Sequence, residues 1–198
     1  MMEECNGIRE GMISVTQALS ILKQDYGPNE DAIEAAALRG QSVHSACAAY
    51  SVGLFPMLTE ETEGYFQSFQ AWFDAHVFRV AMEPERELRD DKLGFLGHMD
   101  LGWLVLNDGR NTLLDIKTPV QFRQTWSVQL AAYWHLVRKE TGLTIIKPGV
   151  ILLDPCGGPA KVKWVDEEEK MSIEQLFSLF LQALNWYKFL RNGNGGRK

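Results

Sequence analysis

The segment 97–133 limits the folds open to this chain more than any other stretch. It reads GHMD, then a turn at 107–109 with the sequence NDG, then LLDIKT, and finally QLAAY. An Asp-Gly turn of this kind joins hairpin strands, so residues 94–106 and 111–118 are predicted to be neighbouring strands. Residues 124–139 have apolar positions at helical spacing and are predicted to form a helix. The order strand, strand, helix favours a layered α/β arrangement.

Polar side chains on the two predicted strands indicate a metal site. Side chains alternate faces along a strand, so Asp115 and Lys117 project together while Leu114 and Ile116 face the core. The hairpin brings Asp100 beside Asp115. Two carboxylates and a backbone carbonyl make an oxygen-rich site suited to Mg²⁺ or Mn²⁺. Such a metal activates water, and Lys117 is expected to position that water or to stabilise developing negative charge.

The predicted helix after these strands carries two more candidate site residues. Gln129 and Tyr133 are four positions apart, so they share one helix face. Taken alone, they are typical of a surface glutamine and a core tyrosine. Their place directly after the DIKT strand favours contacts with a substrate phosphate instead. Trp126 and Phe122 just before them suit base stacking and core packing equally well.

The rest of the chain supplies helices and a second pair of strands. Apolar residues at helical spacing predict four further helices, at 15–24, 30–53, 60–79 and 171–190. The second of these is either one long helix or two helices that meet at Gly40. Extended segments are predicted at 83–90, 150–153 and 161–165, with a turn at 27–29. These elements predict one domain over residues 1–191, an α/β sandwich around a mixed sheet, with a disordered tail at 192–198.

Composition excludes several protein classes. A chain of 198 residues with 45% hydrophobic residues has enough core for one globular domain. It contains neither a membrane-length apolar run nor an N-terminal signal sequence, so a cytoplasmic location and no membrane partner are expected. Cys5, Cys47 and Cys156 are too few and too far apart for a disulfide framework or a zinc site. The net charge of −6 argues mildly against tight nonspecific DNA binding.

The motifs, read in order, resemble those of the PD-(D/E)XK nuclease superfamily, in its RecB-type and lambda-exonuclease-like branch. The matching elements are the RGQSVH helix segment at 39–44, a glutamate at Glu85, GHMD at 97–100, DIK at 115–117 and QLAAY at 129–133. The assignment of Glu85 is loose because other glutamates lie close to it. The proline that names the superfamily is missing. The cysteines that hold an iron–sulfur cluster in some relatives are missing too, so no such cluster is expected.

The resemblance implies a restriction-endonuclease-like fold and a role for each matching residue. The implied metal ligands are His44, Asp100, Asp115 and the Ile116 carbonyl. The implied catalytic residues are Lys117, Asp115, Asp100 and Glu85. The implied substrate-binding residues are Gln129, Tyr133, Arg39 and Trp126.

The activity that the resemblance implies is that of a stand-alone, phage-like, metal-dependent DNA nuclease, more typically an exonuclease than an endonuclease, in recombination, replication or repair. The partners it implies are DNA and a recombinase or single-strand-binding protein, with a homo-oligomer as one arrangement and the host cytoplasm as the location. Two alternatives stay open. One is a nucleic-acid-binding module of the same fold without catalysis, and the other is a phosphodiesterase that acts on RNA or small nucleotides.

Overall fold

The computed structural model describes residues 11–22, 30–118, 122–143 and 146–194. The strands are β1 (Ile13–Ser14), β2 (Val77–Val80), β3 (Glu87–Asp90), β4 (Phe95–His98), β5 (Trp103–Leu106), β6 (Asn111–Lys117), β7 (Lys147–Leu152) and β8 (Lys161–Trp164). The helices are α2 (Val15–Leu19), the 3₁₀ turn η2 (Ser20–Leu22), α3 (Glu30–Ser51), α4 (Glu60–His76), α5 (Gln124–Thr141), α6 (Val165–Glu168) and α7 (Ile173–Asn194). Among the described residues, no helix is long and apolar enough to cross a membrane.

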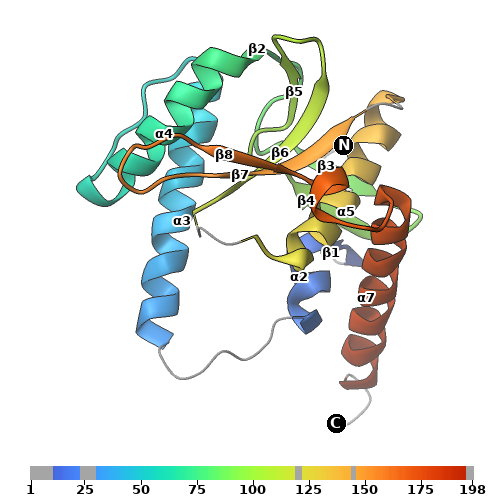
Figure 1. The fold of residues 1–198 in the computed structure, drawn as a ribbon. Helices are drawn as coiled ribbons and strands as arrows, with labels where there is room; N and C mark the ends of the chain where they lie inside the picture. Colours follow the sequence, from blue (N-terminus) through green and yellow to red (C-terminus); the bar gives the residue numbers. More distant parts are fainter. Residues whose placement is uncertain (1–10, 23–29, 119–121, 144–145, 195–198) are drawn as a thin grey trace, which may run out of the picture.

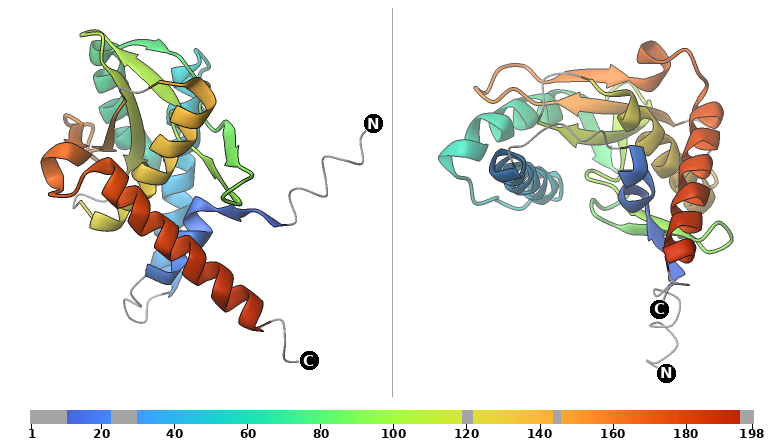
Figure 2. Two further views of the ribbon diagram at one scale, coloured as in Figure 1. Left: turned by 90° about the vertical axis from the view of Figure 1, so that its right-hand side faces the viewer. Right: turned by 90° about the horizontal axis from the view of Figure 1, so that it is seen from below.

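The larger sheet is mixed and lies between two layers of helices. Its strand order is β2-β5-β6-β7-β8, with β6 and β7 parallel and the other neighbours antiparallel. Helices α3 and α4 cover one face, and α5 and α7 lie on the other (Figure 1, Figure 2). The predicted α/β architecture around a mixed sheet is therefore confirmed.

Strand β6 is buried on both of its faces. Leu114 and Ile116 are fully buried and pack in the cluster under α3 and α4, as the alternation predicts. Leu113 points the other way and is buried in the cluster under α5 and α7. A central strand covered on both faces reads as a nearly continuous apolar run, and in such a run a charged side chain stands out.

A second, three-stranded sheet was not predicted. Its order is β1-β4-β3, and β1 runs parallel to β4 with Ile13 opposite Phe95. The extended segment predicted at 94–106 is two strands, since β4 belongs to this small sheet and only β5 pairs with β6 in the large one. This pairing places Ser14 opposite Leu96 of β4.

Several predicted element boundaries also differ from the structure. The helix predicted at 60–79 ends at His76, and β2 follows without a loop. Helix α3 passes through Gly40 as one helix, and the segment predicted at 83–90 is a strand only from Glu87 onward. Helix α7 continues to Asn194, into the segment predicted to be disordered. The turn predicted at 27–29 lies outside the described residues.

Candidate active site

The site forms where β5 and β6 stop pairing. Their ladder ends at Trp103 opposite Leu113, whereas β7 stays paired to β6 as far as Lys117. One edge of β6 is therefore open beyond Leu113. The Asp100 carboxylate takes the place of a pairing strand at this edge, where the Ile116 N–H donates to Asp100 Oδ2 at 2.8 Å. The N–H and C=O of a strand residue point to the same edge, so the Ile116 carbonyl faces the side on which Asp100 lies.

A glycine makes the bend that puts Asp100 there. Gly102 has φ of 64°, in the left-handed region. A Cβ on this residue would lie 2.4 Å from the Met82 carbonyl oxygen, which leaves no space for any side chain. The bend carries the chain from the small sheet into the large one and leaves Asp100 facing β6.

Asp115 and Lys117 form a buried ion pair on one face of β6. The side chain of Asp115 is 4% exposed and that of Lys117 is 16% exposed, with Nζ 2.5 Å from Asp115 Oδ2. Within the described part of the chain, no donor meets this Oδ2 with hydrogen-bond geometry. Burial raises the pKa of Asp115, and Lys117 opposes the rise. Burial by itself lowers the pKa of Lys117, but the nearby Asp115 and Asp100 carboxylates outweigh it and raise that pKa.

His44 on α3 brings an imidazole to the site. Its Nδ1 lies 3.2 Å from Asp100 Oδ1. Burial alone lowers the pKa of His44, but the Asp100 carboxylate outweighs burial and raises it. The pKa of Asp100 is lowered, because His44, Lys117 and the Ile116 N–H together outweigh the effect of burial. The pKa values of the two acids are therefore shifted in opposite directions, which favours the ionised form of Asp100 and the neutral form of Asp115.

Gln129 and Tyr133 extend this cluster along α5. Lys117 Nζ donates to Gln129 Oε1 at 3.5 Å, and Gln129 Nε2 donates to Tyr133 Oη at 3.1 Å. Burial raises the pKa of Tyr133 and keeps its hydroxyl neutral. The tyrosine ring packs on β4 where Gly97 has no side chain, since a Cβ there would lie 2.6 Å from Tyr133 Cε1. Tyr133 can therefore pack against β4 only because residue 97 is a glycine.

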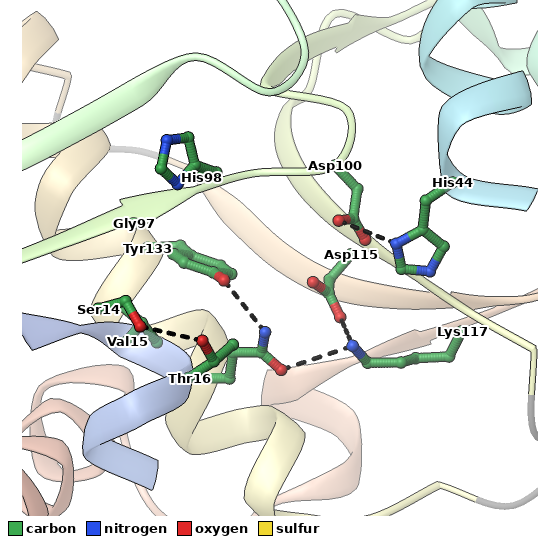
Figure 3. A pocket seen from close by; sticks show the side chains of 11 residues that line it. Ser14, Val15, Thr16, His44, Gly97, His98, Asp100, Asp115, Lys117 and Tyr133 are labelled. Atoms are coloured by element: carbon green, nitrogen blue, oxygen red, sulfur yellow. Dashed lines mark hydrogen bonds and ion pairs between the residues drawn. The ribbon is translucent and has the colours of Figure 1, made fainter. Parts of the chain in front are cut away.

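These side chains line a cavity of about 290 Å³ between α2, α3, β4, β6 and α5. Figure 3 shows Asp100, Asp115, His44 and Lys117 turned toward one another. The lining residues are Ser14, Val15, Thr16, His44, Gly97, His98, Asp100, Asp115, Lys117, Gln129 and Tyr133. A second cavity of about 490 Å³ also contains His44 and Asp100, so the two cavities meet at this pair.

The other predicted site residues lie around this centre in different ways. Glu85 is exposed, lines the second cavity, and has φ of 58°, an uncommon backbone conformation for a glutamate. Partial desolvation of the carboxylate and the nearby Asp100 charge raise its pKa. Arg39 is half-buried on α3 and is not among the lining residues of either cavity. Trp126 is 9% exposed and belongs to the core cluster under α5, with its ring 5.6 Å from Lys117 Nζ.

Three polar residues of the first cavity were not identified from the sequence as site residues. Ser14 and Thr16 enter it because β1 pairs with β4. Ser14 is also the cap of α2, since the Gln17 N–H donates to its Oγ. The exposed His98 side chain also lines the cavity, with Nε2 3.4 Å from Glu87 Oε2. The one sequence signal for His98 is its place two residues before Asp100.

Comparison with known proteins adds no assignment. No protein-family model matches the chain, and a search of curated proteins found no relative.

Proposed function

We propose that this chain is a divalent-metal-dependent DNA nuclease of the PD-(D/E)XK type, with a restriction-endonuclease-like fold. The observation that carries the proposal is the convergence of Asp100, Asp115 and Lys117 at the open edge of β6. Residues from a loop, a strand and the helix α5 meet there in the order that the resemblance implies. The mixed sheet with helices on both faces supports the proposed fold.

The donor atoms at this edge fit Mg²⁺ or Mn²⁺. Carboxylate and carbonyl oxygens are the ligands that these ions prefer, and Asp100, Asp115 and Ile116 supply them side by side. Asp115 Oδ2 is buried and paired with the Lys117 ammonium 2.5 Å away. A carboxylate offers about four lone-pair sites, so acceptor capacity remains for a ligand. Among the described residues, no three His, Cys, Asp or Glu side chains converge on one point, so a backbone or water oxygen has to complete the set. When bound, the metal supplies Lewis acidity, which activates water and offsets phosphate charge.

The remaining residues of the site suit phosphodiester hydrolysis. The Lys117 ammonium lies beside both acids, where it can hold the attacking water or donate to a phosphate oxygen. Gln129 fixes the Tyr133 hydroxyl, and this neutral hydroxyl is a hydrogen-bond donor for a second phosphate oxygen. His44 holds Asp100 in place from the opposite wall.

The recessed position of the acids favours an exonuclease. Asp115 is 3% exposed and lines a cavity to which α2, α3 and α5 also contribute. A single strand end enters such a cavity more easily than the interior of an intact duplex, because the duplex is broader. We therefore propose cleavage from DNA ends.

The test uses end-labelled linear duplex, single-stranded DNA and closed circular DNA, each with Mg²⁺, Mn²⁺ or EDTA. Lys117→Ala is the inactive variant, and Lys161→Ala, at an exposed lysine on β8, is the matched control. We expect metal-dependent loss of linear DNA with circles spared, abolished in Lys117→Ala only. Circular dichroism checks that both variants are folded.

Other outcomes of the same test identify the alternatives. Cleaved circles would show an endonuclease. Cleavage of RNA or a dinucleotide without cleavage of DNA would replace DNA as the substrate. Full activity in Lys117→Ala would refute the assignment. No cleavage of any substrate, together with no Mn²⁺ binding by calorimetry, would leave a module without catalysis.

A further inference from the structure

We propose that Trp126 is a positioning residue for Lys117, and that it acts through a cation–π contact with the lysine ammonium rather than by stacking on a DNA base. The inference rests on the proposed function in one respect, namely that Lys117 is the catalytic group. The role differs from the one implied by the resemblance, in which Trp126 touches the substrate.

Three groups surround the Lys117 ammonium. Asp115 Oδ2 is 2.5 Å from Nζ, Gln129 Oε1 is 3.5 Å away, and the Trp126 ring centroid is 5.6 Å away with the ammonium over the ring. Trp126 and Gln129 are three positions apart on α5, so they belong to the same helix face. That face presents an aromatic ring and an amide oxygen to the last residue of β6.

The ring itself is held firmly. It is 9% exposed, belongs to the core cluster, and meets the Phe122 ring edge-on at 5.9 Å between centroids. The Trp126 backbone N–H donates to the Arg123 carbonyl, which fixes the backbone that carries the ring at the start of α5. A ring packed this deeply has little free face for a nucleotide base, whereas it is well placed to fix a flexible side chain.

A π face suits this task for an electrostatic reason. Lys117 has four rotatable bonds, and fixing them costs conformational entropy. A further carboxylate would hold the ammonium, but it would also add negative charge between two acids and compete for the metal. The ring attracts a cation without carrying net charge, and this attraction grows when water is excluded. It therefore keeps Lys117 near Asp115 while leaving both acids available.

The kinetic test separates positioning from substrate contact. Trp126→Leu should lower kcat roughly 2- to 30-fold, the range expected for loss of a cation–π contact, and leave KM for linear duplex nearly unchanged. Trp126→Phe keeps a smaller ring and should recover part of the loss. A rise in KM at constant kcat would overturn the proposal, because it would show that the ring binds substrate.

Trp134→Leu is the matched control. Trp134 lies on the same helix about 12 Å further along. It is 5% exposed, and the cation over its ring is the Arg138 guanidinium, 4.4 Å from the centroid, rather than Lys117. The two variants thus make the same change in core volume. An equal fall in kcat in both, corrected for the folded fraction, would assign the effect to packing and refute a specific role for Trp126.

A spectroscopic readout keeps the test independent of activity. In protein labelled with ¹³C at lysine Cε, the Lys117 signal, identified by its loss in Lys117→Arg, should be shifted upfield by the Trp126 ring. The shift should vanish in Trp126→Leu and persist in Trp134→Leu. An unshifted Lys117 signal, or one unchanged in Trp126→Leu, would overturn the inference. If the wild-type protein cuts no DNA, the proposed function fails, and this spectrum still decides whether the ring holds the lysine.

Discussion

Replacing Lys117 by methionine should destabilise the protein in a pH-dependent way. Methionine keeps most of the volume of the side chain but removes the cation that pairs with buried Asp115. Removing one partner of a buried ion pair leaves an uncompensated charge, which costs about 3–5 kcal/mol. Asp100, whose pKa is also lowered by Lys117, adds to the repulsion. At pH 8 we therefore expect the free energy of unfolding to fall by about 3–5 kcal/mol.

The sign of the pH dependence follows from the pKa of Asp115. Burial raises it from the ordinary 3.8 to about 6, so the folded state binds this proton more tightly than the unfolded state. The resulting stability is present below pH 3.8 and is lost as the pH rises through about 6. Without Lys117 the pKa of Asp115 rises further, so the loss in the free energy of unfolding at pH 8 is larger. At pH 5 the carboxyl is mostly protonated, so most of the deficit should disappear.

Urea denaturation at pH 5 and pH 8 measures both quantities. Lys161→Met makes the same chemical change at an exposed position on β8 and should stay within about 0.5 kcal/mol of wild type. A deficit in Lys117→Met that is equal at both pH values, or no larger than that of Lys161→Met, would refute the argument, because the carboxylate would then not be both buried and paired.

Three further predictions test other parts of the site and its support. Gly97→Ala should lower kcat at least about tenfold while the protein stays folded, as measured by steady-state kinetics. The alanine Cβ would lie 2.6 Å from Tyr133 Cε1 and would displace the tyrosine ring whose hydroxyl is hydrogen-bonded to Gln129. Asp90→Asn should cost about 1.5–3 kcal/mol in urea denaturation, because the Asp90 carboxylate accepts hydrogen bonds from the Leu93 N–H and from His135. Mg²⁺ at one hundred times its dissociation constant should add about 2.7 kcal/mol to the unfolding free energy of wild type but little to that of Asp115→Asn, a difference that differential scanning calorimetry detects.

The part of the site that could be predicted from the sequence depends on local geometry. Asp115 and Lys117 share a face because side chains alternate along a strand, and Gln129 and Tyr133 share a face because a helix repeats about every four residues. The NDG turn places the strand that follows Asp100 beside β6. Each of these spatial relations involves residues that are close in the sequence, so it can be predicted without knowing the rest of the fold.

What the sequence did not reveal depends on pairing between distant segments or on competing local signals. The strand β2 follows α4 directly, and Val77 continues the apolar spacing of the helix. The hydrophobic periodicity therefore did not show where the helix ends and the strand begins. The break between β4 and β5 depends on Gly102, whose requirement is visible only once Met82 is known to lie against it. Ser14 reaches the cavity only because β1 pairs with β4, a contact between remote parts of the chain.

The site owes its position to an interruption in the larger sheet. Had β5 stayed paired with β6 beyond Leu113, the Ile116 N–H and carbonyl would have been taken up by the ladder, and Asp100 would have had no place at that edge. The bend at Gly102 removes β5 from this stretch, and the freed backbone gains a carboxylate as its partner instead of a strand. On its other edge β6 stays paired with β7 as far as Lys117, so the strand that carries Asp115 and Lys117 stays rigid. A rigid strand with one open edge provides both fixed side chains and free backbone oxygen, the combination that a hard metal ion and a phosphodiester need together.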